Sequence, residues 1–403
     1  MRTLGVAMAL LLLASGAHAA ICDGCPAKLS DRLIRNLVER LANDDLEGRD
    51  NDTPASVRAQ EILIRRLRRA GRGLNPAGLR SEAYRQHFTS GPQVGTNLLA
   101  VVRGRELPNE YVIVGAHYDH LDTRSNASGV CRSMGTPGGA VCNGATDNAT
   151  GVAAVIAIGR ALKKRPPRRS VVLALWDSEE DGLLGSLHYV NNPLVPLAQT
   201  VAYVNFDILG SDLLPSLATT SFAVGPETGS GLTDVVTAAA GAEQFGTLPI
   251  SYIFGQLRSD YASFVAKSVP TVFFSDSTNG CYHTTADDLD VVDWAKLAKQ
   301  ARIALRAVAN LADTTTPPAF VAPNPALAAF ADALTLQQVF TIATPDLPLF
   351  SPADQQVFTG VRTAIDQIVA DGPAAFDQGD VAVLVNAALD GIAAIQRLGC
   401  RKL

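Results

Sequence analysis

Apolar strand-like segments that alternate with helix-like segments constrain the fold of this chain more than any other feature. Residues 169–177 and 200–208 have the composition of buried strands, and residues 96–117 hold two further strand-like segments. Helical spacing of apolar residues separates them at 148–164 and 182–192. Strands that alternate with helices form largely parallel sheets. We therefore expect an α/β fold: a mostly parallel mixed sheet covered by helices on both faces.

The chain divides into four expected parts. Residues 1–19 combine one arginine, a short apolar stretch and an Ala-His-Ala site, which is typical of a secretory signal peptide. Residues 20–312 carry the alternating pattern and form the expected catalytic domain. A Pro-rich linker follows at 313–326. Residues 327–403 are rich in alanine with helical spacing, so we expect a small C-terminal helical extension.

Hydropathy and charge indicate where the protein is located in the cell and which partners it does not bind. After the signal peptide, no segment runs for ~18 residues without charges or turn signals, so we expect a secreted or periplasmic protein without a membrane span. The sequence holds 34 Lys and Arg against 39 Asp and Glu, a formal net charge of −5, and no arginine-rich tract. This balance does not suit the phosphate backbone, so we expect no nucleic-acid partner.

Six cysteines in an exported chain permit three disulfides. Cys131 and Cys142 bracket a Gly-rich loop, and we expect them to pair. Cys22 and Cys25 have the spacing of a zinc knuckle or a redox motif, but no second cysteine pair follows, so we expect a structural disulfide there. Cys400 is expected to join either that N-terminal pair or Cys281.

Acidic and histidine residues gather where the expected strands end. Ligands of open α/β sheets bind beyond the carboxyl ends of the strands, so these residues should lie close together. Two further residues lie where a loop meets a regular element: Asp147, just before the expected helix at 148–164, and His283 in "GCYHTTADD". The candidate residues are His117, Asp119, Asp147, Glu179, Glu180, Asp207 and His283.

A bound metal explains this group best. Asp147 alone could be a helix N-cap, and Glu179 and Glu180 alone could be a solvated charge cluster. Together, however, the groups would be buried at one edge, where each uncompensated charge costs several kcal/mol. Nitrogen and oxygen ligands without cysteine suit zinc, and less well cobalt or manganese. They are too many for one tetrahedral ion, so we expect two ions that share one carboxylate and together activate a water.

The motifs resemble those of the co-catalytic zinc aminopeptidases of the M28 peptidase family. The resemblance rests on "AHYDH", "GATDNATGV", "SEEDGLLGS", "NFDILG" and "YHTTADDLD", in family order, and covers roughly Leu29 to Ala312. It implies the fold of those aminopeptidases and a pair of zinc ions. It also implies an exported enzyme that acts on peptides with a free N-terminus.

The resemblance assigns a metal role to five residues. It implies that His117 and Asp207 hold one zinc and that Glu180 and His283 hold the other. Asp147 would bridge both ions.

Two further residues acquire catalytic roles from the resemblance. Glu179 would bind no metal and would act as the general base, and Asp119 would orient His117. His120 is common in the family pattern and is not expected to be a ligand. Tyr261 stands where the pattern usually carries a histidine, which affects substrate contacts rather than metal binding.

Three other functions compete with an exported di-zinc aminopeptidase. A glutaminyl cyclase shares the fold but uses a single zinc, and the intact ligand set argues against it. A carboxypeptidase of the same family commonly carries an inserted protease-associated domain, for which residues 72–109 leave no room. A non-catalytic binding module would be expected to have lost a ligand or the base, and neither is missing.

Overall fold

The computed structural model describes most of the chain. The expected signal peptide, the Cys22 and Cys25 pair and part of the expected linker lie outside the described residues. The described ranges are 29–122, 131–132, 141–323 and 328–401.

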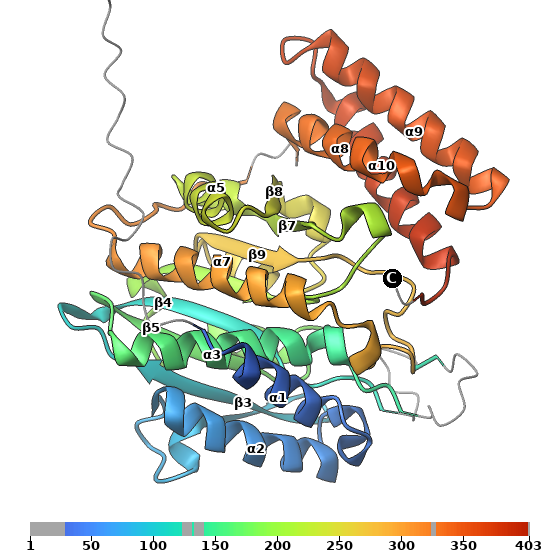
Figure 1. The fold of residues 1–403 in the computed structure, drawn as a ribbon. Helices are drawn as coiled ribbons and strands as arrows, with labels where there is room; N and C mark the ends of the chain where they lie inside the picture. The colour runs from blue at the N-terminus through green and yellow to red at the C-terminus, as the bar shows by residue number, and fades with distance from the viewer. Residues whose placement is uncertain (1–28, 123–130, 133–140, 324–327, 402–403) are drawn as a thin grey trace, which may run out of the picture.

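Nine strands of the described chain form one mixed sheet (Figure 1). They are β1 (Arg72–Gly73), β2 (Arg85–Ser90), β3 (Gln93–Val102), β4 (Leu107–His117), β5 (Arg169–Trp176), β6 (Thr200–Phe206), β7 (Thr220–Val224), β8 (Gly246–Ile250) and β9 (Thr271–Ser275). The order is β1-β3-β5-β4-β6-β9-β7-β8, and β2 pairs with β3. The central strands β5, β4, β6 and β9 are parallel, whereas antiparallel pairs join β3 to β5 and β7 to β9.

Helices lie on both faces of this sheet, which confirms the expected fold class. Helices α1, α2, α3, α5 and α7 share a core with one face, and α4 and α6 share a core with the other. Their bounds are α1 (Asp31–Leu41), α2 (Pro54–Ala70), α3 (Thr150–Lys164), α4 (Leu184–Asn191), α5 (Leu232–Glu243), α6 (Tyr261–Val265) and α7 (Trp294–Asp313).

The local sequence explains where these elements begin and which faces they bury. The Ser30 side chain accepts the N–H of Leu33 at the start of α1, which satisfies one of the free donors of a helix end. Alternate residues of a strand point to opposite faces. Val112 and Val114 of β4 therefore lie in the first core, whereas Ile113 lies in the second.

The C-terminal part of the chain forms three helices, of which the first packs against β8 (Figure 1, orange to red). Their apolar residues join the second core, so this segment packs on the rest of the chain at the β8 edge of the sheet. The helices are α8 (Phe330–Ala343), α9 (Pro352–Asp371) and α10 (Gln378–Arg397).

Two disulfides tie loops of the described structure together. Cys131 pairs with Cys142, as expected. Cys400 pairs with Cys281, which was one of the two expected partners. The second bond links the residue three places after α10 to the loop that follows β9.

Within the described residues, α10 is the one helix that is long and apolar enough to cross a membrane by length and composition. Buried helices of soluble proteins pass the same test, and Leu384, Ala387 and Ala394 of α10 contribute to the second core. The absence of a membrane span therefore stays an expectation.

Candidate metal centre

The expected ligand residues meet at one edge of the sheet. They follow the carboxyl ends of the parallel strands β4, β5, β6 and β9, or precede α3, which is where ligands bind in open α/β sheets. His117 ends β4, Asp147 precedes α3, Glu179 and Glu180 follow β5, Asp207 follows β6, and His283 lies in the loop after β9.

One group of ligand atoms surrounds the ring of His117. Its Nε2 lies 3.2 Å from Asp147 Oδ1 and 3.3 Å from Asp207 Oδ1. Glu179 belongs to this group, because ligand atoms of Glu179, His117 and Asp207 lie within 4.8 Å of one another. All four side chains are buried.

A second group lies on the other side of Asp147. His283 Nε2 lies 3.1 Å from Glu180 Oε2 and 3.3 Å from Asp147 Oδ2. Asp147 thus turns Oδ1 toward the first group and Oδ2 toward the second. This is how a carboxylate is placed when it bridges two ions.

His120 also belongs to the second group, although sequence reasoning set it aside as a ligand. Its Nδ1 lies 2.8 Å from Glu180 Oε1 and 3.9 Å from Asp147 Oδ2. The one sequence signal for this position was its place beside Asp119 in the "AHYDH" motif. Tyr261 lies outside both groups, because its hydroxyl donates to Tyr252 O and accepts the N–H of Leu257.

Two further carboxylates contact the candidate ligand residues. Asp119 Oδ2 accepts the backbone N–H of Glu180, and Asp119 Oδ1 lies 3.6 Å from His117 Nδ1. Asp287 accepts the backbone N–H groups of Thr146 and Asp147 at 2.9 and 3.0 Å. Such outer contacts fix the orientation of ligands and are a regular part of metal sites.

Arg49 joins the segment after His117 to the segment before Asp147, and sequence reasoning missed it. Its side chain is 1% exposed and donates four hydrogen bonds to backbone carbonyls. Those carbonyls belong to Leu41, Tyr118, Asn143 and Gly144. No motif marks such an arginine, because its partners are backbone atoms from distant segments.

The charges of the centre shift the titration of its histidines. Burial lowers the pKa of His117, but the charges of Glu179 and Asp207 outweigh it, so the pKa is raised well above 6.5. Burial likewise lowers the pKa of His283, while Glu180 and its neighbours raise it to about 10. The centre therefore attracts positive charge, and protons compete with a cation for the same atoms.

The donor set fits zinc. Four buried carboxylates and the histidines offer oxygen and nitrogen ligands in two adjoining groups. His283 Nε2 is buried near two carboxylate oxygens without a hydrogen-bond partner among the described residues. Burying these acids without a cation would cost several kcal/mol per charge.

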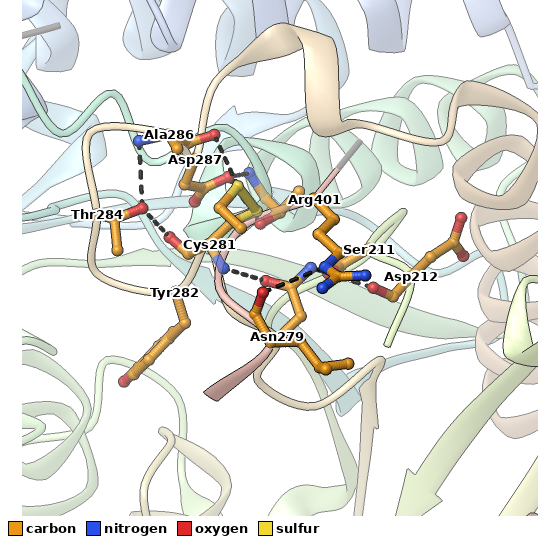
Figure 2. The surroundings of a disulfide bond; sticks show 12 residues. Ser211, Asp212, Asn279, Cys281, Tyr282, Thr284, Ala286, Asp287 and Arg401 are labelled. Carbon is orange, nitrogen blue, oxygen red and sulfur yellow. Dashed lines mark hydrogen bonds between the residues drawn. A yellow bond between two sulfur atoms is a disulfide. The ribbon is translucent and has the colours of Figure 1, made fainter. Parts of the chain in front are cut away.

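The disulfide between Cys281 and Cys400 is close to this centre, because Cys281 lies two residues before His283 in the sequence. Figure 2 shows Cys281 between Asn279 and Thr284. The Asn279 side chain accepts the backbone N–H of Cys281, and the Thr284 hydroxyl donates to the Cys281 carbonyl. Asn279 also donates to Ser211 Oγ in the loop after β6. The segment that carries His283 is therefore fixed from two sides.

Similar proteins are known for the part of the chain that holds the centre. The leupeptin-inactivating enzyme 1 of Streptomyces exfoliatus is 33% identical over 129 residues, which cover 31% of this chain and 25% of that protein. An aminopeptidase of Pseudomonas aeruginosa is 38% identical over 117 residues, 28% of this chain and 18% of that protein. The matched segment thus spans no more than a quarter of either relative.

Solved structures share the fold at low identity. The LapA aminopeptidase of Legionella pneumophila superposes with a TM-score of 0.55 at 17% identity, over 72% of this chain and 73% of that one. A glutaminyl cyclase of Porphyromonas gingivalis reaches 0.54 at 19% identity, over 70% and 99%. At this level of identity the likeness concerns the fold alone, and it does not separate the two activities.

A sequence profile decides the family. The profile of Peptidase family M28 matches residues 97–308, just over half of the chain, and this range includes both groups of ligand atoms. The chain therefore belongs to peptidase family M28.

Proposed function

We propose that this protein is an exported di-zinc aminopeptidase that hydrolyses the N-terminal peptide bond of peptides. The observation that carries the proposal is the position of Asp147. Its two carboxylate oxygens face two separate groups of ligand atoms, and each group holds a histidine and at least one further carboxylate. A site for a single ion would need only one such group.

Five side chains are proposed to hold the metal. His117 and Asp207 would hold one zinc, Glu180 and His283 the other, and Asp147 both. His120 is a further candidate neighbour of the second ion. When bound, two zinc ions supply Lewis acidity that lowers the pKa of a water and polarises a peptide carbonyl. Cobalt or manganese would suit the same atoms.

Glu179 is proposed as the general base. It lies beside His117 and Asp207 but is not one of the five proposed metal ligands, so its carboxylate is available to accept a proton. It would take a proton from the attacking water and pass it to the leaving amine. Asp119 would keep the imidazole of His117 in position through the contact described above.

A carboxylate that binds no metal suits a peptide with a free N-terminus. An amine that carries a positive charge is attracted by buried carboxylates, whereas an N-acetyl group offers no charge and adds bulk. Glu179 is one candidate partner of this amine, because it lines the cavity next to the ligand residues.

Export and domain organisation form part of the same proposal. The two disulfides of the described structure suit an oxidising compartment such as the periplasm or the extracellular space. We propose a signal peptide at 1–19, a catalytic domain at 20–312, a linker at 313–326 and a helical extension at 327–403. No nucleic-acid partner and no membrane span are expected.

Glutaminyl cyclase is the second candidate, because the structures of such enzymes share this fold. A cyclase polarises the side-chain amide of an N-terminal glutamine with one ion and must exclude a reactive water. Neither of the two groups of ligand atoms around Asp147 lacks a member, which favours the hydrolase.

Product analysis separates these functions. The zinc-loaded protein is incubated with an unblocked peptide, its N-acetylated counterpart and a peptide with N-terminal glutamine. We expect free amino acid from the unblocked peptides and none from the acetylated one. Pyroglutamate with release of ammonia, together with inactivity toward the other peptides, would establish the cyclase instead.

A further inference from the structure

A cavity of about 170 Å³ adjoins the metal centre. Its lining includes carboxylates of the centre, among them Glu179 and Asp207, but most of its residues are apolar. A single water needs roughly 10–15 Å³ measured in the same way, so the cavity has room for a large side chain. Pockets that are mainly apolar with a few polar groups at one place are the usual form of small-molecule sites.

The apolar lining comes from two parts of the chain that are distant in sequence. Leu213, Phe222 and Ile250 belong to the part of the chain that also carries the centre. The rest of the wall comes from the C-terminal helices, which form no part of the metal centre. It includes Leu336 and Phe340 of α8, Phe358 of α9, and Gly391, Ile392 and Ile395 of α10.

Polar contacts hold this second wall against the sheet. Asp332 at the start of α8 accepts the backbone N–H of Ser251 at 2.8 Å and its hydroxyl at 2.7 Å. Asp346 accepts the backbone N–H of Ser216 at 2.9 Å. Beyond α10, the Cys281–Cys400 disulfide adds a covalent tie. The wall is therefore fixed at three separate points.

We propose that the C-terminal helices complete the pocket that receives the N-terminal side chain of the substrate, and that they make the enzyme selective for long aliphatic and aromatic residues. The proposal rests on the aminopeptidase function proposed above. A substrate amine beside Glu179 places its own side chain in the adjoining cavity.

The mainly apolar lining disfavours charged substrate side chains in this pocket. Apart from the carboxylates of the centre, Arg258 is the one charged residue among the described residues that line the cavity. Its Nη2 donates to Tyr282 Oη at 3.3 Å, and its guanidinium lies 5.7 Å from the centre of that ring. A lysine or glutamate of the substrate would lose water among apolar groups, which disfavours its binding.

Gly391→Leu tests the pocket from the side of the helices. A Cβ at Gly391 would lie 3.5 Å from Phe340 Cζ, an ordinary contact, so a side chain there can enter the cavity without moving the backbone. Gly360→Leu on α9 is the matched control, because Gly360 is exposed and a Cβ there meets nothing within 4 Å. Both changes replace a helical glycine by the same residue.

Two measurements are made on the full, zinc-loaded chain: hydrolysis of alanine, leucine and phenylalanine nitroanilides, and calorimetric binding of L-alaninol and L-phenylalaninol, which have a free amine but no amide bond to cleave. We expect the unchanged protein and Gly360→Leu to prefer the large residues at least about tenfold in both assays, as apolar pockets commonly do. Gly391→Leu should reduce this preference about tenfold or more while alanine substrates are still cleaved.

The outcomes separate the pocket from the catalytic proposal. A binding preference for L-phenylalaninol over L-alaninol that Gly391→Leu removes would support the pocket even if no nitroanilide were cleaved, and the proposed function would then be wrong. Hydrolysis with equal preference for alanine and phenylalanine, or a preference that Gly391→Leu leaves unchanged, would overturn the pocket and leave the aminopeptidase intact.

Discussion

Replacement of Arg49 by methionine should strongly destabilise the protein, although Arg49 is not one of the candidate metal ligands. The substitution keeps the apolar stem but removes four hydrogen bonds to carbonyls of buried or nearly buried segments. A buried acceptor left without a partner costs about 1–3 kcal/mol. At the low end, four carbonyls give a loss of about 4 kcal/mol in the free energy of unfolding.

Urea unfolding followed by tryptophan fluorescence measures this loss. Arg58→Met is the matched control, because Arg58 is exposed and pairs with Glu47 at 3.2 Å. Exposed ion pairs contribute about 0–1 kcal/mol, so the control should change little. If Arg49→Met lost no more stability than Arg58→Met, the carbonyls would not depend on the guanidinium, and our account of how the ligand loops are held would be wrong.

Three further predictions concern the proposed base Glu179, the buried acid Glu227 and the Cys281–Cys400 disulfide. Glu179→Gln should leave both metals bound and lower turnover about 10²–10⁴-fold, whereas Glu180→Gln should lower metal occupancy; metal analysis beside nitroanilide hydrolysis checks this, and the reverse pattern would exchange the two roles. Burial raises the pKa of Glu227 from 4.5 to about 7, with Asp332 nearby adding to the shift. The folded state then holds a proton that the unfolded state releases, so stability should fall by about 1–3 kcal/mol as pH rises from about 4.5 to about 7. Glu227→Gln should remove this fall in urea titrations at several pH values, and an unchanged pH profile would contradict the assignment. Cys400→Ser opens a loop with a sequence separation of 119 residues and should cost about 4 kcal/mol in the same assay, and a loss under about 1 kcal/mol would show that the tether contributes little.

The centre of the sheet could be predicted because strands that are buried on both faces are continuous apolar segments. All eight residues of β5 are buried, and the expected segment at 169–177 matches it within one residue. The short strands β7 and β8 were not predicted. Each has five residues, and β8 contains a proline, so their extended form follows from pairing with each other and, for β7, with β9.

The candidate site was predictable to the extent that chemistry follows strand ends. His117, Glu180 and Asp207 could be placed together because parallel strands deliver their carboxyl ends to one edge. Arg49 could not, since its partners are carbonyls that only the folded chain brings together. The cavity wall formed by α8 to α10 could not be predicted for the same reason. The apolar residues of these helices indicate that the helices pack against another element, but the sequence does not identify that element.

Metal stoichiometry tests the central claim most directly. The metal-free protein is titrated with zinc while bound metal and hydrolysis of leucine nitroanilide are followed together. We predict that binding saturates near two ions per chain, shared between the groups on either side of Asp147, and that full activity needs both ions. Saturation at one tight zinc, with no hydrolysis of aminoacyl substrates and with conversion of N-terminal glutamine to pyroglutamate, would contradict it.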